Sequence, residues 1–447
     1  MYKYSYSGFI IVLFLFYSFV NRVSAQEDKS RLIVTTDLGG SDPDDIQSMI
    51  HLLLCSDLVD LEGLISTQAW VDDPDKTEAL RITVEQFIEV LPNLQKHSSG
   101  YPTAEKLRSL IKRGQVKAHM SGVGAGLDSP GSQLIVQAIK NSKDKRPLWL
   151  VAWGGMNTIA QAIWFLRHSE SEKQFRKYLS RIRIYDILGQ DDAGAYIAKN
   201  YPDIPYIRNT EVYGWAPDDT WTRENIQSRM PLGNNYPNRI WATEGDSPSF
   251  LYVLSNGLNV PEHPDFGGWG GRFDTEKKKN IRGMDFIEKS GKTEKIYDDY
   301  YMIFSASEGV KSIKRWEDHI RNDFAARMLW SQESDFAKVN HHPIVVVNGK
   351  QSKLPTYIKV KPGQSINLSA EGTTDPDGNP LSYKWSAYDE PSSYSGKVLI
   401  SDSTSQKCSI TFPETSAGSK IHIILEVTDN GQPSLTSYHR VVIEIEG

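Results

Sequence analysis

The sequence is poor in cysteine, has no long basic run, and has no apolar segment after its N-terminal stretch that is long enough to span a bilayer. Its 447 residues include only 2 cysteines, Cys55 and Cys408, which excludes a disulfide framework. The net charge of −6 and the missing basic run argue against a nucleic-acid binder and against an electrostatic membrane anchor. The sequence therefore indicates a globular protein with two or three domains.

Residues 1–25 have the features of a cleaved secretory signal. The basic Lys3 precedes the apolar stretch FIIVLFLFYSFV, and VSA precedes Gln26. Small residues at the −3 and −1 positions predict cleavage near Ala25. We expect the mature protein to be soluble and either secreted or periplasmic.

Strand-like and helical patterns alternate through the first half of the mature chain. This alternation predicts an α/β domain, a mostly parallel sheet with helices on both faces, over residues 31–331. Ligands of such sheets bind beyond the carboxyl ends of the strands. The predicted strands are 31–37, 59–67, 147–153, 181–188 and 204–209, and helical periodicity lies at 46–54, 134–139 and 159–166.

The pattern changes twice after residue 210. Segment 210–300 is rich in Gly, Pro and aromatic residues, and loops this long are more often functional than idle. A helix at about 311–331 closes the domain, and a polar linker follows at 332–342. Short alternating strands then predict an all-β immunoglobulin-like sandwich over residues 343–447.

Four aspartates crowd into the stretch RLIVTTDLGGSDPDD, residues 31–45, directly after the first predicted strand. Asp42, with the proline after it, can cap a helix whose first turn carries Asp44 and Asp45. Capping does not explain Asp37, which ends the strand on the other side of a glycine turn. A converging set of carboxylate oxygens suits Ca²⁺ or Mg²⁺. Taken alone, the stretch is compatible with a cap and turn or with a metal site.

The same stretch resembles the opening motif of nucleoside hydrolases, D-x-D-x-G-x-D-D. Asp37 matches the second aspartate and Asp44-Asp45 match the closing pair, whereas Thr35 replaces the first aspartate and the turn is about three residues longer. Further similar segments follow in the family's order: GLIST (63–67), WGGMNTIAQAI (153–163) and GDSPSF (245–250).

Longer strings are similar to a family of secreted proteins, labelled cellulose-binding, that couple a nucleoside-hydrolase-like domain to a C-terminal Ig-like domain. This resemblance covers residues 31–447. It is carried by LGQDDAGAYIAKNYP, EGDSPSFLYVLSNGLNVPEHPDFGGWGGRFD and NDFAARMLW.

The nucleoside hydrolase resemblance implies a Ca²⁺ site at the bottom of the pocket. Asp37 and Asp45 would be carboxylate ligands, Asn157 would offer its backbone carbonyl, and Asp246 would be the late ligand. Asp37 would also take the proton of the metal-polarised water, and Asp44 would hydrogen-bond a sugar hydroxyl. Attack by that water on an oxocarbenium-like sugar carbon would complete the reaction.

Departures from the family pattern affect the substrate. The usual histidine before the late aspartate, one proposed acid for the leaving group, is Gly245 here. The family's sugar-binding asparagine has no clear match, and Gln68 and Trp70 occupy that region. The family's Glu-x-Asn element, which also binds the sugar, is not evident around GQDDAG. We expect a glycoside other than a common nucleoside.

Other residues are candidates for binding substrate. Trp70 and Trp153 can stack on sugars, although core packing is the alternative for any large aromatic. Gln190 and Asp191 follow the fourth strand, where ligands bind, but Asp191 or Asp192 can instead cap a helix. The same two interpretations, stacking and packing, hold for Trp215, Trp221 and Trp269.

Several further residues have two interpretations each. Glu244 and His263 are the nearest candidates for a replacement general acid, with a plain surface position as the alternative. Arg272 can bind an acidic sugar or pair with Asp274. A calcium-binding loop begins with a spacing similar to that of Asp375, Asp377 and Asn379. The distal glutamate of such a loop is missing here, so a turn is the better interpretation.

These observations favour a secreted Ca²⁺-dependent glycosidase whose partner is a plant-type polysaccharide or oligosaccharide, with the Ig-like domain as spacer or docking module. The alternative is a non-catalytic, cellulose-like polysaccharide-binding protein with a degenerate hydrolase pocket. A purely structural surface protein is the third possibility. The sequence predicts no nucleic-acid partner and leaves the oligomeric state open.

Overall fold

The computed structural model describes residues 29–68, 75–280 and 299–447. The predicted signal peptide and Trp70 lie outside these residues. An eight-stranded sheet forms the centre of the N-terminal domain, in the order β3-β2-β1-β4-β5-β6-β8-β7, and its pairs are parallel except β7 with β8. The strands are β1 (Arg31–Thr36), β2 (Asp60–Ser66), β3 (Ile111–Arg113), β4 (Leu148–Ala152), β5 (Ile182–Ile187), β6 (Tyr206–Asn209), β7 (Lys278–Lys279) and β8 (Tyr301–Phe304).

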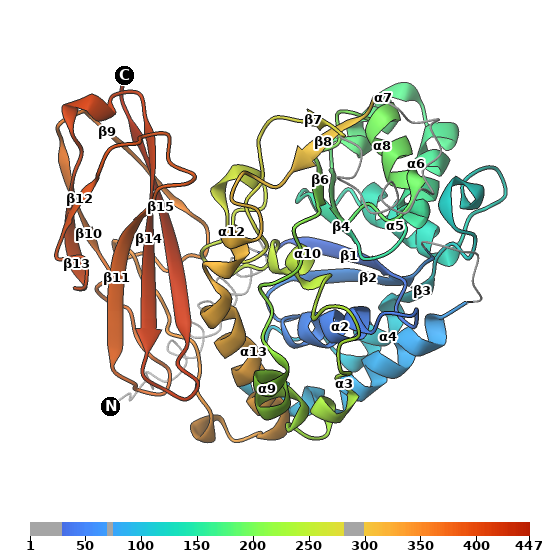
Figure 1. The fold of residues 1–447 in the computed structure, drawn as a ribbon, viewed down its shortest axis with the longest axis horizontal. Helices are drawn as coiled ribbons and strands as arrows, with labels where there is room; N and C mark the ends of the chain where they lie inside the picture. The colour runs from blue at the N-terminus through green and yellow to red at the C-terminus, as the bar shows by residue number, and fades with distance from the viewer. Residues whose placement is uncertain (1–28, 69–74, 281–298) are drawn as a thin grey trace, which may run out of the picture.

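Along the central strands, successive apolar side chains point to opposite faces of the sheet. Both faces are therefore apolar and are covered by helices. In β1, Leu32 and Val34 point into one apolar cluster and Ile33 points into another. The first cluster is covered by α2 (Asp44–Leu54), α3 (Thr77–His97), α4 (Ala104–Leu110), α10 (Ser247–Leu251) and α13 (Glu317–Gln332). The second is covered by α5 (Pro130–Lys140), α6 (Asn157–Ser169), α7 (Glu172–Leu179) and α8 (Asp192–Asn200) (Figure 1). The α/β prediction is confirmed.

Between β6 and β8 the described chain is mostly irregular, with short helical turns such as α9 (Asp219–Thr222) and the two-residue strand β7, and a further short helix, α12 (Lys311–Lys314), follows β8. No helix among the described residues is long and apolar enough to cross a membrane.

The C-terminal domain is a strand-rich sandwich, as predicted. One sheet has the order β10-β13-β12 and the other the order β11-β14-β15-β9. Between the sheets lies an apolar cluster around the buried Trp385. The strands are β9 (Thr356–Val360), β10 (Ser365–Ser369), β11 (Leu381–Tyr388), β12 (Leu399–Ser401), β13 (Lys407–Thr411), β14 (Lys420–Asp429) and β15 (Thr436–Ile445). Cys55 and Cys408 are both free and buried.

The sandwich packs against the N-terminal domain beside α12 and α13 (Figure 1). Arg440 of β15 is fully buried there, and it donates from Nε to the Leu258 carbonyl at 2.9 Å and from Nη2 to the Gly267 carbonyl at 2.7 Å. Trp316 packs edge-on against Tyr438, with ring centroids 5.6 Å apart. Hydrogen bonds from a buried guanidinium and aromatic packing therefore hold the two domains in one arrangement.

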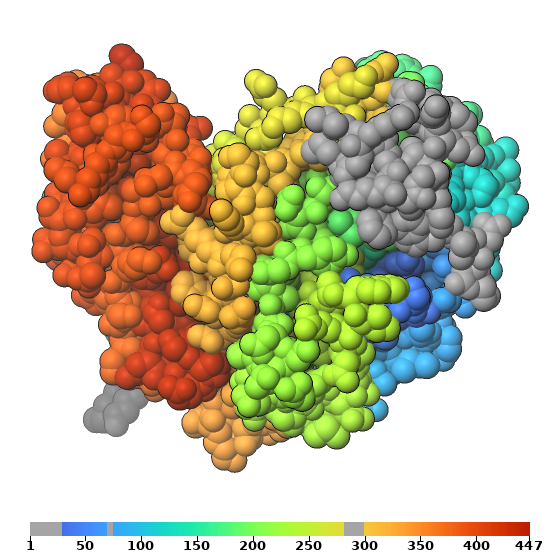
Figure 2. Space-filling view, viewed as in Figure 1, coloured from blue at the N-terminus to red at the C-terminus, as the bar shows by residue number. Residues whose placement is uncertain are grey.

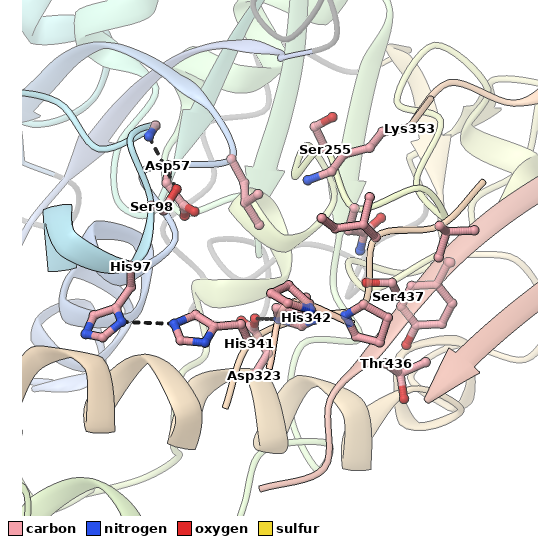
Figure 3. A pocket seen from close by; sticks show the side chains of 18 of the residues that line it. Asp57, His97, Ser98, Ser255, Asp323, His341, His342, Lys353, Thr436 and Ser437 are labelled. Carbon is pink, nitrogen blue, oxygen red and sulfur yellow. Dashed lines mark hydrogen bonds and ion pairs between the residues drawn. The ribbon is translucent and has the colours of Figure 1, made fainter. Parts of the chain in front are cut away.

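The segment between the domains is itself packed. His341 faces His97 of α3, with Nε2 of His341 and Nδ1 of His97 2.9 Å apart (Figure 3). Nδ1 of His341 also lies 2.9 Å from Asp377 of the sandwich. Phe336 stacks on His341 at 3.5 Å. Beside these rings lies a cavity of about 620 Å³, which His342 and Asp323 also line. Asp375 accepts the backbone N–H groups of Asp377 and Asn379, which is the turn interpretation of that stretch.

Arg440→Ala should lower the free energy of unfolding by about 3 kcal/mol, because it leaves two buried carbonyls without donors. Urea denaturation measures the loss. Arg81→Ala, which removes an exposed ion pair with Glu78, is the matched control and should change stability by less than about 1 kcal/mol. Equal effects of the two substitutions would contradict a role for Arg440 in joining the domains.

His422 predicts acid lability at the same interface. Burial, followed by repulsion from Arg440, Lys420 and His263, lowers the pKa of His422 to about 3. Because the unfolded chain binds this proton more readily than the folded one, stability should fall by about 1 kcal/mol per pH unit as the pH drops from about 6.5 toward 3. His422→Asn keeps an acceptor for Arg440 and should flatten that slope in urea titrations at several pH values. An unchanged slope would assign the lability to other groups.

Candidate functional site

The site begins where β1 ends and α2 starts. Asp37 directly follows β1, so its carboxyl group lies at the carboxyl edge of the sheet, and α2 starts at Asp44. The cap position of α2 is Pro43, which offers no side-chain cap, and Asp42 receives the Asp44 N–H only at 3.4 Å. The predicted Asp42 cap is therefore weak. Capping leaves most of the aspartate crowding unexplained.

Three of the aspartates converge in the structure, and Asp37, a predicted ligand, is not one of these three. Asp44, Asp45 and Asp246 each place one carboxylate oxygen within 4.8 Å of the others. Asp37 and Asp45 share a side-chain hydrogen bond. Thr36, which the sequence did not single out, donates its hydroxyl to Asp45. Residues 200 positions apart in the chain thus form one acidic cluster.

The electrostatics of this cluster are unfavourable without a cation. Burial raises the pKa of Asp37 to about 6, and burial together with the neighbouring carboxylates raises that of Asp44 to about 7. The pKa values of Asp45 and Asp246 are well above the usual range for the same two reasons. Asp246 Oδ2 is buried and has no hydrogen-bond partner among the described residues. An all-oxygen set with an unpartnered buried oxygen fits a hard divalent cation.

Two glycines allow the backbone to approach these carboxylates. A Cβ at Gly154 would lie 2.8 Å from Asp37 Oδ1, and one at Gly245 would lie 2.5 Å from Asp44 Oδ2. A Cβ at Gly245 would also lie 2.9 Å from Cε1 of Tyr213. The space into which a side chain at position 245 would project is therefore taken by Asp44 and Tyr213. This explains why the family's histidine is absent here.

Glu244 holds the turn before Asp246. It has a φ of +51°, is buried, and accepts the Tyr236 hydroxyl at 2.9 Å while its other oxygen lies 2.7 Å from His51 Nδ1. With both carboxylate oxygens engaged, Glu244 positions the turn that carries Asp246 and is not a free acid. His263, the other candidate acid, is exposed and stacks on Phe266 at 4.3 Å next to the C-terminal domain, which is the surface position given above as its alternative.

Asn157 begins α6, and its side chain joins three segments. Its Nδ2 donates to the Gln68 carbonyl at 2.9 Å and the Lys117 carbonyl at 2.8 Å, and its Oδ1 accepts the Thr67 hydroxyl at 2.7 Å. The side chain is thus structural, and the contribution of the Asn157 backbone carbonyl to a metal stays a prediction.

The predicted sugar-binding residues lie mostly in the core. Trp153 is 1% exposed and donates its indole N–H to Ser249 at 2.6 Å, which favours its packing alternative. Gln190 donates to the Trp153 carbonyl. Asp191 caps α8 through the Ala193 N–H, and burial raises its pKa to about 8. Trp215 and Trp269 are buried as well, and Trp221 packs partly buried against the core.

The predicted ion pair of Arg272 with Asp274 is wrong, because each residue pairs with another partner. Arg272 pairs with Glu308, with Nη2 2.8 Å from Oε2, while Asp274 pairs with Lys278. Asp192 accepts the Met120 N–H at 2.9 Å. Both residues therefore have structural partners.

Tyr213 and the His51–Glu244 pair were missed at the sequence level. Tyr213 follows the carboxyl end of β6, where ligand-binding residues are expected, so a signal for it existed. No sequence pattern connects His51 with Glu244, which are 193 positions apart.

Comparisons with known proteins agree with this architecture. The family described as "Cellulose-binding Sde182, nucleoside hydrolase-like domain" matches residues 31–273, and "Cellulose-binding protein Sde0182, C-terminal domain" matches residues 365–445. No curated protein matches the chain.

Among solved structures, a nucleoside hydrolase-related hypothetical protein from Saccharophagus degradans, associated with carbohydrate metabolism, is 43% identical. It covers 94% of this chain and 100% of its own, with a TM-score of 0.89. A PKD domain from the KIAA 1837 protein is 17% identical over 21% of this chain and 82% of its own length, with a TM-score of 0.16. The chain belongs to the cellulose-binding Sde182 family, whose N-terminal domain is nucleoside hydrolase-like.

Proposed function

We propose that the protein is a hydrolase that cleaves a glycosyl bond of a carbohydrate, with Ca²⁺ held by Asp37, Asp45 and Asp246 and by the backbone carbonyl of Asn157. The observation that supports this proposal is the convergence of the buried carboxylates of Asp44, Asp45 and Asp246, of which Asp246 Oδ2 has no hydrogen-bond partner among the described residues. A divalent cation in such a site lowers the pKa of a coordinated water. The proposed site of action is outside the cytoplasm, in keeping with the cellulose-binding family description.

Residues of the chain itself accept the proton, bind the sugar and position Asp246. Asp37, half-buried at the end of β1, accepts the proton of the attacking water. Asp44 faces Gly245 and the half-exposed Tyr213, and its carboxylate accepts a hydrogen bond from a sugar hydroxyl. The engaged Glu244 keeps Asp246 in place at the start of α10.

A non-catalytic polysaccharide-binding role is the second candidate. The observation that favours it is the engagement of Glu244, one of the two predicted leaving-group acids, on both of its carboxylate oxygens. On this view the carboxylates and their cation bind sugar hydroxyls without cleaving the chain. The family description is compatible with either role.

Ca²⁺ should raise the melting temperature of the metal-stripped protein and should not raise that of Asp45→Asn. Binding to the folded state alone adds about 2.7 kcal/mol at a Ca²⁺ concentration a hundredfold above Kd. Calorimetric Ca²⁺ titration should find one site in the wild type and none in the variant. Asp203→Asn removes an exposed carboxylate and serves as the control that keeps the site. Equal Ca²⁺ binding by wild type and Asp45→Asn would remove the metal from the proposal.

Asp37→Asn should lower turnover of a cleaved glycoside roughly 10²–10⁴-fold, because the attacking water loses its proton acceptor. Release of reducing ends from cello-oligosaccharides in the presence of Ca²⁺ measures the rate, and calorimetry with the same oligosaccharide measures binding. Binding should change little if the variant still holds Ca²⁺. Loss of binding and turnover together, or of neither, would count against water activation by Asp37.

A further inference from the structure

Large aromatic and aliphatic side chains are exposed close to the acidic cluster. Trp241 is 67% exposed and Ile240 is 61% exposed, only a few residues before Asp246, and Tyr213 is 43% exposed. By contrast, Trp153, Trp215 and Trp269 are buried in the core. Apolar side chains left in solvent beside a polar site indicate a surface that binds a partner.

The loop that carries Trp241, residues 237–244, is fixed to the helix that carries the carboxylates. Gln47 of α2 is buried and donates from Nε2 to the Pro237 carbonyl at 2.9 Å, while its Oε1 accepts the Glu244 N–H, also at 2.9 Å. A single side-chain amide thus closes both ends of the loop. Arg239 pairs with Asp219 at 2.8 Å and ties the middle of the loop to α9. The position of the 237–244 loop therefore depends on the same helix turn as that of Asp44 and Asp45.

Tyr213 and Asp44 approach the same glycine, Gly245, which directly follows this loop. Both the ring of Tyr213 and the Asp44 carboxylate border the position of a Cβ at Gly245. Burial and the nearby carboxylates raise the pKa of Tyr213, so its hydroxyl keeps its proton and can donate a hydrogen bond. Figure 2 shows the green to yellow-green segment 210–245 on the same face of the molecule as the blue residues around α2.

We propose that Tyr213 and Trp241 form a platform that stacks sugar rings of a neutral glucan chain as the chain leads away from the acidic cluster. This inference rests on the proposed function, because it extends the carboxylate site to neighbouring sugar units. Pyranoses with equatorial hydroxyls present flat C–H faces to aromatic rings, and their hydroxyls donate to carboxylates. An anionic polymer or a nucleotide phosphate would be repelled by the carboxylates. The platform therefore favours an uncharged chain over an anionic one.

The test is calorimetric titration of the full chain, with Ca²⁺ present, with cellohexaose as the probe. Trp241→Ala should weaken binding at least about tenfold, because an exposed stacking ring is lost. Tyr213→Phe keeps the ring and should stay closer to the wild type than Tyr213→Ala. Tyr357→Ala removes a ring that is 48% exposed on β9 of the C-terminal domain and should leave the affinity unchanged. Since Trp241 is exposed, its removal should not lower the melting temperature, which excludes misfolding.

Each outcome separates the platform from the hydrolase proposal. Weaker binding by Trp241→Ala without any release of reducing ends by the wild type supports the platform and overturns hydrolysis. Unchanged binding and cleavage of cellohexaose by Trp241→Ala overturns the platform and leaves hydrolysis standing. A loss in Tyr357→Ala as large as in Trp241→Ala overturns the platform and assigns chain binding to the C-terminal domain. No binding of cellohexaose by the wild type overturns the platform as well.

Discussion

The repulsion between buried carboxylates at the carboxyl edge of the sheet is the constraint on which the rest of the site depends. Asp45 and Asp246 are buried and Asp37 is half-buried, and the three come from different segments and repel one another. Holding them together requires a backbone that approaches closely at Gly154 and a left-handed residue at Glu244. In the function proposed above, a bound cation offsets this repulsion.

The C-terminal domain is part of this construction and not a tethered module. Arg440 gives its hydrogen bonds to backbone carbonyls of the 258–267 segment, which follows α10 directly. Asp246 lies at the start of α10. The interface between the domains thus stabilises the chain on one side of α10, while Glu244 and its partners stabilise it on the other. A sandwich docked so closely restrains Asp246 as well as the orientation of the two domains.

Much of this architecture follows from local sequence pattern. The alternating apolar residues of β1 predict a sheet buried on both faces, and the aspartates after it predict the place of the site, because both depend on neighbours in the chain. Contacts between distant segments left no such signal: the partnership of His51 with Glu244 and the burial of Trp153 depend on tertiary packing. A tryptophan at the end of a strand gives the same sequence pattern whether its side chain faces the core or a ligand.

Position 245 connects the departure from the nucleoside hydrolase pattern to the choice of substrate. With glycine there, the backbone lies against Asp44, and Tyr213 fills the adjoining space. An imidazole at this position would reach toward a leaving base, whereas the ring of Tyr213 offers a flat face and a hydroxyl. The loop closed by Gln47 carries the exposed indole of Trp241. The strand-turn-helix stretch thus keeps the carboxylates of the hydrolase-like pocket, and the segment from 210 to 245 determines what is presented to them.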